Sequence, residues 1–499
     1  MNRNKVSGNW ENRDPLKPAR IRSSCTCKDC WDHVAVRKER TVIRLGIQGE
    51  NQVMREELRR KLSDMLDDNI LERGLILLDD HLKPLWTLFD QRQVPMDGWS
   101  DEQVEILFKI LARMDTDKDE KAARVGEREG RTPSGYVLSL AEGFAHGIGR
   151  SGNIAAMQPK APGGSILNLM ADRLANSLLK QVGLPRVKAS IVFPVATGMS
   201  IASCLAAIHG NWVRKDKHNP WKRGEVIVPR LDHRSPLKGI RFSGFTPRIV
   251  EGELDGHGVV VPLEHIQEAI GPGTGAILST TAFFPPRQPD CIKKIAKLCA
   301  DEGIPHVVNN SYGIQSTRYL ALLRGAIDAG RIDYIVQSTD KNFLTPVGGA
   351  VVTSPSKEKI QALSRVYAGR ASAQPILQFM ASVLILGISG YKKLMEQQVA
   401  HRDYLEEEVG RIASRAGQHL LDVDNPIAVA MSVNGLSKDL GGKLYTLRVT
   451  GPKVIFPGDF GSCIDDYPEP YLTLNAGIGA RNEDFERLIG KLEEVFLDK

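Results

Sequence analysis

Few cysteines and few aromatic residues occur in this chain of 499 residues, and neither sign of charge dominates it. Seven cysteines exclude a small disulfide-stapled scaffold and are typical of a reducing compartment, so we expect a cytoplasmic protein. Lysine and arginine number 66 against 60 acidic residues, and the net charge of +6 permits an anionic partner without requiring one. The hydrophobic share of 42% is ordinary for a globular protein and is enough for a large core.

The sequence also lacks a continuous apolar run that reads as a membrane span. The longest uncharged stretch, residues 189–210, is interrupted by Pro194 and by a Thr197-Gly198 turn, so it predicts a strand, a turn and a helix. The N-terminus has no apolar signal core. Its arginine-rich opening is similar to an organelle presequence, but the acidic residues within it argue against that interpretation, and we expect no membrane attachment.

Residues 1–52 show no periodicity and predict an extension without a fixed fold. Within it, Cys25, Cys27, Cys30 and His33 are residue types that bind zinc. Their spacing fits no common zinc module, so we expect no metal, with structural zinc as the alternative.

Residues 53–164 predict a helical N-terminal arm that ends in a glycine-rich loop. From Val53 to Phe89 apolar residues recur at steps of three and four, the pattern of two amphipathic helices, with a break expected near Gly74. Another helix is expected from Glu102 to Met114. Because the arm carries an apolar stripe, it must pack either on its own body or on another subunit.

Residues 165–395 predict a large α/β domain, and residues 396–499 a small α+β domain. In the first, short β-rich runs alternate with helices, which is typical of a parallel sheet covered on both faces. A long helical stretch from about Gln374 to Ala416 leads into the second, which ends in a helix from Asn482. The expected strands are 189–193, 225–228, 276–278, 306–308, 334–336, 349–352, 427–433, 443–449 and 470–474.

Lys341 is the residue that most clearly indicates chemistry. It follows the expected strand Tyr334–Val336, at the edge where ligands collect in α/β sheets. An amine in that position can attack an aldehyde and form a Schiff base. Taken alone, an ordinary surface lysine is the alternative.

Two features precede Lys341 in the order that a pyridoxal-phosphate enzyme requires. Ala196, Thr197 and Gly198 open a helix directly after a strand, where free backbone N–H groups can hold a phosphate. Asn309 ends another strand, one βαβ unit before Lys341. The order predicts pyridoxal 5'-phosphate as cofactor and the aspartate-aminotransferase type of fold, fold type I. Asp usually stands in the place of Asn309, so a weaker electron sink is expected.

The loop from His146 to Lys160 contains a G-x-G-x-x-G pattern at Gly147, Gly149 and Gly152. A dinucleotide fingerprint needs a strand before it and a helix after it, whereas a helix is expected before this loop and Pro159 interrupts the segment after it. The loop is better interpreted as an anion site, with a plain surface loop as the alternative. Its expected ligands are Arg150, Ser151, Gln158 and Lys160, and Arg370 from a later turn could complete bidentate phosphate recognition.

Together these segments resemble the O-phosphoseryl-tRNA(Sec):selenocysteinyl-tRNA synthase family, whose members are O-phosphoseryl-tRNA(Sec) selenium transferases. The likeness runs from about residue 85 to 480 and keeps the family order. Its most specific part is the combination of the Gly126–Arg131 motif with the Gly149–Lys160 loop. The other matching segments are 195–200, 279–281, 307–315, 337–343, 346–349 and 369–372.

The resemblance implies a role for each matching residue. Lys341 would carry pyridoxal 5'-phosphate, and Arg128 would reach the cofactor in a neighbouring subunit's site. Glu127 would repel a free α-carboxylate, so that only an esterified aminoacyl-tRNA is accepted. The phosphate of the substrate would be held by Arg150, Ser151, Gln158 and Arg370.

The chain departs from the family pattern at several places, two of which concern expected site residues. Arg230-Leu231-Asp232 leads into His233-Arg234 instead of Gln-Lys, so His233 could stack on the cofactor ring and Arg234 could keep the positive charge. Leu447 stands where animal members place a tRNA-reading arginine. Arg448 beside it and Arg92 in the arm are therefore the tRNA contacts that we expect.

The implied reaction converts tRNA(Sec) carrying phosphoserine into selenocysteinyl-tRNA(Sec), by loss of phosphate and addition of selenium from selenophosphate. The implied assembly is a homotetramer, a dimer of dimers. Two alternatives stay open. One is another fold-type-I lyase or decarboxylase that acts on a small phosphorylated amine, and the other is an RNA-binding or scaffold protein on the same fold.

Overall fold

The structure is a computed structural model that describes residues 54–127, 129–215, 218–219 and 222–497. The chain divides into two compact units, one ending at His81 and the other spanning Leu82–Lys499. The predicted N-terminal extension, with Cys25, Cys27, Cys30 and His33, lies outside the described residues, as does Arg128.

The first unit consists of a helix over residues 54–62 and the beginning of α2 (Asp68–Gln91). Arg55 ties the two together, because its guanidinium bonds Glu72 and lies 2.9 Å from the Asp79 carboxylate. The break between the helices falls at residues 63–67, so the expectation of a break near Gly74 was wrong. Gly74 has open space around it, and a single glycine costs a helix about 1 kcal/mol, which α2 tolerates.

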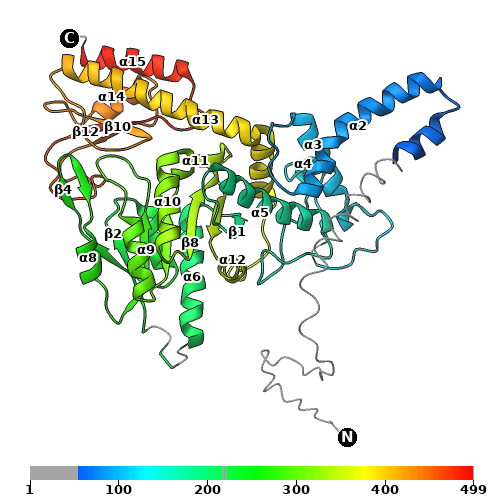
Figure 1. Ribbon diagram of the computed structural model, residues 1–499, viewed down its shortest axis with the longest axis horizontal. Coiled ribbons are helices and arrows are strands. Elements are labelled where there is room, and N and C mark those ends of the chain that lie inside the picture. Colours follow the sequence, from blue (N-terminus) through cyan, green and yellow to red (C-terminus); the bar gives the residue numbers. More distant parts are fainter. Residues whose placement is uncertain (1–53, 128, 216–217, 220–221, 498–499) are drawn as a thin grey trace, which may run out of the picture. The chain divides into compact units, whose positions relative to one another are not determined.

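A seven-stranded sheet forms the centre of the second unit (Figure 1). Its strand order is β1-β9-β8-β7-β6-β2-β3, and all six strands predicted in this region are present. The strands are β1 (Ala189–Phe193), β2 (Glu225–Pro229), β3 (Thr246–Val250), β6 (Thr274–Thr280), β7 (His306–Asn309), β8 (Tyr334–Ser338) and β9 (Ala350–Ser354).

The sheet is parallel except at β9, which runs antiparallel to both β1 and β8. The prediction of a wholly parallel sheet was therefore wrong at this strand. The physical reason is the connection from β8, which contains only the single-turn helix α11 (Thr339–Phe343) and a short loop. A parallel return needs a crossover of a dozen or more residues, so the chain turns back antiparallel.

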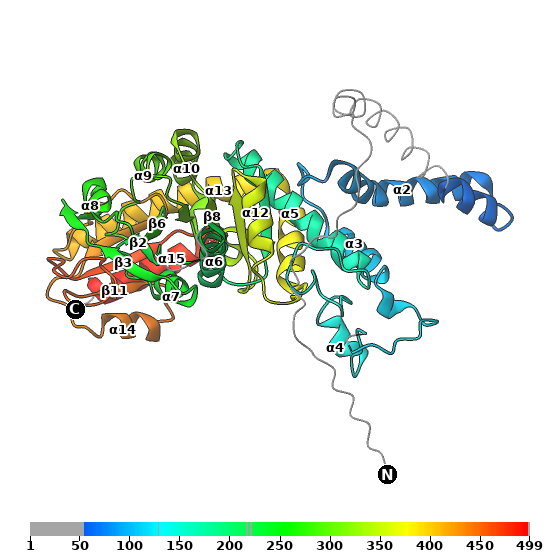
Figure 2. The ribbon, with the colours of Figure 1, turned by 90° about the horizontal axis from the view of Figure 1, so that it is seen from below.

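Helices cover both faces of the sheet, as expected (Figure 2). Helices α8, α9 and α10 lie on one face, and α6 and α7 lie on the other, as right-handed crossovers require for this strand order. These helices are α6 (Thr197–Lys215), α7 (Arg234–Phe242), α8 (Leu263–Glu268), α9 (Ile292–Asp301) and α10 (Thr317–Ala329).

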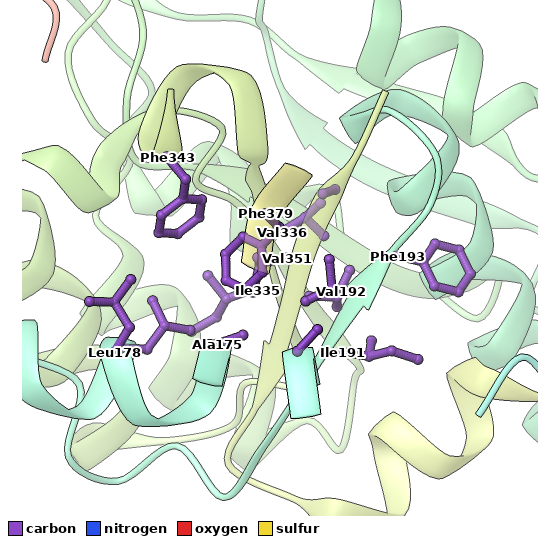
Figure 3. Close-up of a cluster of buried hydrophobic side chains, with 14 of the residues drawn as sticks. Ala175, Leu178, Ile191, Val192, Phe193, Ile335, Val336, Phe343, Val351 and Phe379 are labelled. Atoms are coloured by element: carbon purple, nitrogen blue, oxygen red, sulfur yellow. The ribbon is translucent and has the colours of Figure 1, made fainter. Parts of the chain in front are cut away.

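The core beneath the β1 end of the sheet is made by residues far apart in sequence (Figure 3). Side chains of α5 (Pro162–Val182) meet those of β1, β8, β9 and α11, and Phe379 from α13 (Gln374–Arg415) joins them. The remaining helices of this region are α3 (Asp101–Arg113), the 3-10 helix η1 (Thr116–Lys118), α4 (Gly135–Ser139) and α12 (Lys357–Ser364).

Of the helices in the described part of the chain, α13 has the length and hydropathy that could cross a membrane, but half of its apolar stretch is buried in the fold. Its residues Phe379, Met380 and Leu384 belong to the main core, so we interpret it as a core helix. Gly387 interrupts α13, because its φ of 62° is not helical. The segment 95–99 approaches α13 at this point, and a Cβ at Gly387 would lie 2.7 Å from the backbone of Asp97, so a larger residue would clash there.

A small antiparallel sheet, in the order β10-β12-β11, follows α13 and has a core of its own. Two of its three predicted strands are confirmed, but the segment predicted as a strand at 443–449 begins inside helix α14. The reason is that Leu440 and Leu444, one helical turn apart, both bury against the small core. The elements are β10 (Ala428–Ser432), α14 (Leu440–Thr446), β11 (Lys453–Ile455), β12 (Tyr471–Asn475) and α15 (Asn482–Phe496). A separate hairpin consists of β4 (Glu253–Asp255) and β5 (Gly258–Val260), and Val259 is buried in a cluster with Leu421 and Tyr467.

His306 on β7 gives the fold a predictable dependence on pH. Its ring is fully buried between the Ser279 hydroxyl, at 2.7 Å, and the Arg331 carbonyl, at 3.1 Å. Burial lowers the pKa of His306 from 6.5 to about 4. Between these two pH values His306 is protonated in the unfolded chain but stays neutral in the native protein. The contribution of the neutral His306 ring to the free energy of unfolding is complete above pH 6.5 and is lost as the pH falls from 6.5 toward 4. At pH 5 we expect a loss of about 2 kcal/mol from this residue.

The measurement is urea unfolding of the wild type and of His306→Gln at pH 7 and pH 5. Other groups titrate equally in both proteins, so the variant should lose less stability between the two pH values. An identical loss in both proteins would show that His306 is not the responsible group.

Candidate active site

A cavity of about 470 Å³ opens at the carboxyl edge of the large sheet. The segments that follow β1, β2, β6, β7 and β8 all contribute to its wall, as expected where parallel strands end together. The predicted cofactor residues within the described chain all line it: Ala196, Thr197, Gly198, His233, Asn309 and Lys341.

Lys341 lies on α11, a single helical turn that follows β8 directly. The next residue holds this turn in place. Asn342 donates from Nδ2 to the carbonyls of Ser311, at 2.7 Å, and Ser338, at 2.8 Å, and its Oδ1 accepts the Ile314 N–H at 3.1 Å. Lys341 is itself exposed to the cavity, so its amine is presented by a firmly anchored backbone.

The start of α6, where the sequence predicts a phosphate cradle, offers free backbone donors to the cavity. The N–H groups of Met199 and Ser200 both donate to the Ala196 carbonyl, which leaves those of Thr197 and Gly198 without an intrahelical acceptor. Both residues line the cavity. A dianion there gains from the free donors and from the positive end of a 19-residue helix.

His233 caps α7, whose first turn lies next to the start of α6, because a Cβ on Gly198 would lie 3.2 Å from the Ser235 Cβ. Its Nδ1 accepts the Ser235 N–H at 3.3 Å, so in the neutral ring the proton sits on Nε2. Burial lowers the pKa of His233, and the charges of Lys341 and Lys453 lower it further. The ring is therefore neutral at pH 7, and it lines the cavity next to Phe283, with ring centroids 6.1 Å apart.

Asn309 is buried at the end of β7, with its side chain in a neutral hydrogen-bond chain. Its Oδ1 accepts the Ser311 hydroxyl at 3.1 Å, and its Nδ2 lies 3.4 Å from the Thr280 hydroxyl. A lysine, a helix N-terminus, a neutral imidazole and a buried amide around one cavity form a donor set that fits pyridoxal 5'-phosphate.

A second, open pocket of about 510 Å³ contains the predicted phosphate ligands. Its wall consists of Glu127, Arg150, Ser151, Gln158, Lys160 and Arg370. Four of these residues, Arg150, Ser151, Gln158 and Arg370, are the predicted set, and Glu127 is the predicted filter. The structure thus brings together residues separated by more than 200 positions in the sequence.

Glycines make this convergence possible. Ile148 and Ala371 exchange backbone hydrogen bonds of 2.9 and 3.2 Å, which places Arg370 beside the 147–152 loop. A Cβ on Gly147 would lie 2.1 Å from the Ala371 carbonyl oxygen, so no larger residue permits this approach. The glycine pattern therefore serves a close backbone contact, and a dinucleotide fingerprint is excluded because no strand precedes it among the described residues.

Lys160 is a pocket residue absent from the set that the resemblance implied. Its ammonium forms an ion pair with Glu129 and lowers the pKa of that carboxyl. The pair leaves Lys160 partly neutralised, so Arg150 and Arg370 provide most of the positive charge available to a dianion.

The lysine cavity and the phosphate pocket share no lining residue in the part of the chain that the structure describes. Arg128, expected to reach a neighbouring subunit, lies outside the described residues.

The two expected tRNA contacts lie in separate basic pockets. Arg448 lines a pocket of about 590 Å³ together with Arg487 and Lys491, and Asn475 lines both this pocket and the lysine cavity. Arg92 lines a pocket of about 500 Å³ whose other cations are Arg173, Lys180 and Lys188.

Sequence reasoning missed the aromatic wall of the lysine cavity and its small-domain side. Phe284 contacts Phe283 and Tyr312, with ring centroids 5.3 and 5.8 Å apart, and the Lys453 ammonium lies 4.0 Å from the centre of the Phe284 ring. Asn475, Gly477 and Ile478 come from the small domain. Nothing in their local sequence marks them as cavity residues.

Known proteins similar to this chain agree on one family. The model of the family described as O-phosphoseryl-tRNA(Sec) selenium transferase, SepSecS, matches residues 114–497. A selenium transferase of that name from Methanopyrus kandleri is 43% identical over 435 residues, covering 86% of this chain and 98% of the relative. The relative from Dictyostelium discoideum is 32% identical, over 84% of this chain and 94% of its own length.

Solved structures agree on the fold, and one of them, at 41% identity, is of the same family. The crystal structure of an archaeal O-phosphoseryl-tRNA(Sec) selenium transferase superposes with a TM-score of 0.82 at 41% identity, covering 86% of this chain and 98% of that one. A sphingosine-1-phosphate lyase from Burkholderia pseudomallei, at 13% identity and a TM-score of 0.55, shares the fold alone. The predicted fold class, the pyridoxal-phosphate-dependent transferase fold of type I, is confirmed. This chain belongs to the O-phosphoseryl-tRNA(Sec) selenium transferase family.

Proposed function

We propose that this protein converts O-phosphoseryl-tRNA(Sec) into selenocysteinyl-tRNA(Sec), the last step of selenocysteine synthesis. It is a selenium transferase that depends on pyridoxal 5'-phosphate. The observation that carries the proposal is the gathering of Arg150, Ser151, Gln158 and Arg370 in one pocket, in a chain that also presents Lys341 beside a helix N-terminus.

Pyridoxal 5'-phosphate fits the lysine cavity. Thr197 and Gly198 would bind its phosphate, His233 would stack on its ring, Asn309 would contact the pyridine nitrogen and Lys341 would bond it covalently. The bound cofactor supplies an electron sink for the negative charge that develops when the α-proton leaves. Arg128 from another subunit is the further ligand that we propose for it.

The remaining chemistry is the work of side chains of this protein. The Lys341 amine takes the α-proton of the phosphoseryl group as a general base, and later returns a proton. Arg150 and Arg370 hold the phosphate dianion and stabilise it as it departs. Ser151 and Gln158 complete its hydrogen bonds. Selenophosphate then acts as the selenium donor.

The basic pockets support a tRNA substrate. We propose that Arg448 contacts the acceptor end, because Asn475 joins its pocket to the lysine cavity. Arg92 and its neighbouring cations would contact the phosphate backbone of the tRNA farther along its acceptor arm. Removing either arginine should weaken tRNA binding and reduce its dependence on salt.

We also propose a cytoplasmic homotetramer, a dimer of dimers, in which Arg128 of one chain reaches the site of a neighbouring subunit. The exposed apolar side chains of α2, which include Ile70 and Leu77, would provide the contact between dimers. Leu85 and Leu88 belong to the core of the second unit, so a truncation that tests the arm should end at residue 81. Light scattering should report dimers after truncation, and an active full-length monomer would contradict the proposal.

The direct test of the function is an absorbance scan of the purified protein with and without phosphoseryl-tRNA(Sec). We expect a visible cofactor band that changes on addition of the substrate, and selenocysteinyl-tRNA as product once selenophosphate is present. A protein without a cofactor band would instead be an RNA-binding or scaffold protein.

Glu127 provides a test of substrate choice. Its carboxylate lies in the wall of the phosphate pocket, where it would repel the α-carboxylate of free phosphoserine. Glu127→Gln should therefore release phosphate from free phosphoserine at least about tenfold faster than the wild type. A wild type that already turns over small phosphorylated amines, with no response to the substitution, would favour the lyase or decarboxylase alternative.

A further inference from the structure

One buried amide links the lysine-bearing turn to the small domain. Gln315 ends the 3-10 helix η2 (Gly313–Gln315), just after β7, and its side chain is 3% exposed. Its Nε2 donates to the carbonyls of Tyr312, at 3.0 Å, and Lys341, at 3.3 Å. Its Oε1 accepts the N–H of Ile478 at 2.7 Å. Both amide hydrogens and the oxygen are therefore used.

The two ends of this bridge come from segments far apart in the sequence, α11 and the segment after β12, and the Ile478 side chain packs in the main core. Lys341 lies on α11, whose other side-chain anchor, Asn342, bonds within the large domain. Ile478 follows β12 of the small domain and lines the lysine cavity together with Asn475 and Gly477. A movement of the 475–478 segment is therefore transmitted by the Gln315 amide to the Lys341 carbonyl.

The small-domain end of the bridge adjoins a basic pocket. Asn475 belongs both to the lysine cavity and to the pocket that contains Arg448 and Arg487. A ligand bound in that pocket contacts the end of β12. The chain after β12 leads to Ile478, whose N–H donates to Gln315. The path from the pocket to Lys341 is short and consists of backbone and one side chain.

We propose that Gln315 is a positioning residue that couples the placement of Lys341 to docking of the small domain by a bound tRNA. The inference rests on the proposed function, since it needs Lys341 to carry the cofactor and the Arg448 pocket to bind tRNA. Gln315 also lines the lysine cavity, but its amide is held in the three bonds described above, so its effect is assigned to the Lys341 carbonyl.

The test uses the full-length protein with bound cofactor and uncharged tRNA(Sec), which can bind but cannot react. In the wild type, binding should change the visible cofactor band, because docking moves Lys341. Gln315→Met keeps the shape of the side chain but removes all three bonds. We expect it to bind tRNA with unchanged affinity, to keep a borohydride-reducible cofactor, and to lose the change in the band. With charged substrate, kcat should fall about tenfold to a hundredfold while KM stays within about twofold.

Gln398→Met is the matched control. Gln398 is equally buried, and its Nε2 donates to the Pro426 carbonyl at 3.0 Å, but it does not line the lysine cavity. This variant should lose comparable stability and keep the tRNA-induced change.

Several outcomes would overturn the coupling. The first is a Gln315→Met protein whose cofactor band still changes when tRNA binds. The second is a wild type whose cofactor band does not change when tRNA binds. The third is a Gln398→Met protein that loses the tRNA-induced band change as fully as Gln315→Met does. A wild type without a cofactor band or without tRNA affinity would instead overturn the proposed function itself.

Discussion

Replacing Lys341 with alanine should abolish both selenocysteinyl-tRNA formation and the borohydride-reducible attachment of the cofactor. Alanine offers neither an amine for the covalent bond nor a base for the α-proton, and loss of a general base alone costs about 10²–10⁴-fold. The fold should survive, because Lys341 is exposed and α11 is anchored by Asn342 rather than by the lysine. Borohydride trapping followed by peptide mapping, together with turnover of phosphoseryl-tRNA(Sec), measures both effects.

Lys341→Arg is the matched control for this experiment, because it keeps the positive charge without a nucleophilic amine. It should be as inactive as the alanine variant. Trapping of the cofactor on a different lysine in Lys341→Ala would show that the cofactor lysine is misassigned.

Truncating either phosphate-binding arginine should reduce turnover of phosphoseryl-tRNA(Sec) about tenfold to a hundredfold. A hydrogen bond to a charged group contributes about 1.5–3 kcal/mol, and each arginine can give two to one phosphate. Arg150 is exposed in the pocket, so Arg150→Ala mainly removes its charge and donors. The Arg370 guanidinium also donates to the His146 carbonyl, so Arg370→Ala should loosen the neighbouring loop as well. Single-turnover kinetics of phosphate release measure the loss.

Arg365→Ala is the control, since Arg365 is an exposed arginine at the end of α12 that lies outside the phosphate pocket. It should behave as the wild type. Arg370→Lys should recover only part of the activity, because an ammonium cannot make the paired contacts of a guanidinium. Normal kinetics in both Arg150→Ala and Arg370→Ala would refute the phosphate-pocket interpretation.

The three errors in the predicted fold have different physical causes. The apolar residues at 440–449 permit either a strand or a helix, and burial of Leu440 and Leu444 on the small core selects the helix. The orientation of β9 follows from the short link after β8, which the strand pattern alone does not reveal. The break after residue 62 lies beside Asp67 and Asp68, whose charges favour the start of α2.

The sequence by itself determined the chemistry-bearing features that are local. A helix directly after a strand, a polar residue at a strand end and a lysine one βαβ unit later are each encoded within a few residues, and their order indicates the fold class. The structure places all of the described cofactor residues in one cavity, as that order requires. The roles of Lys341 and of the phosphate ligands remain proposals, which substitution of Lys341, Arg150 and Arg370 tests.

Only the tertiary structure decided which distant residues meet. The approach of Ala371 to Gly147 places Arg370 in the phosphate pocket, and the bond from Gln315 to Ile478 brings the small domain to the lysine. Each contact joins segments more than 150 residues apart, and no periodicity or motif within one segment indicates that it meets the other. Such contacts arise from the packing of two domains around a shared cavity, and their energy depends on both surfaces at once.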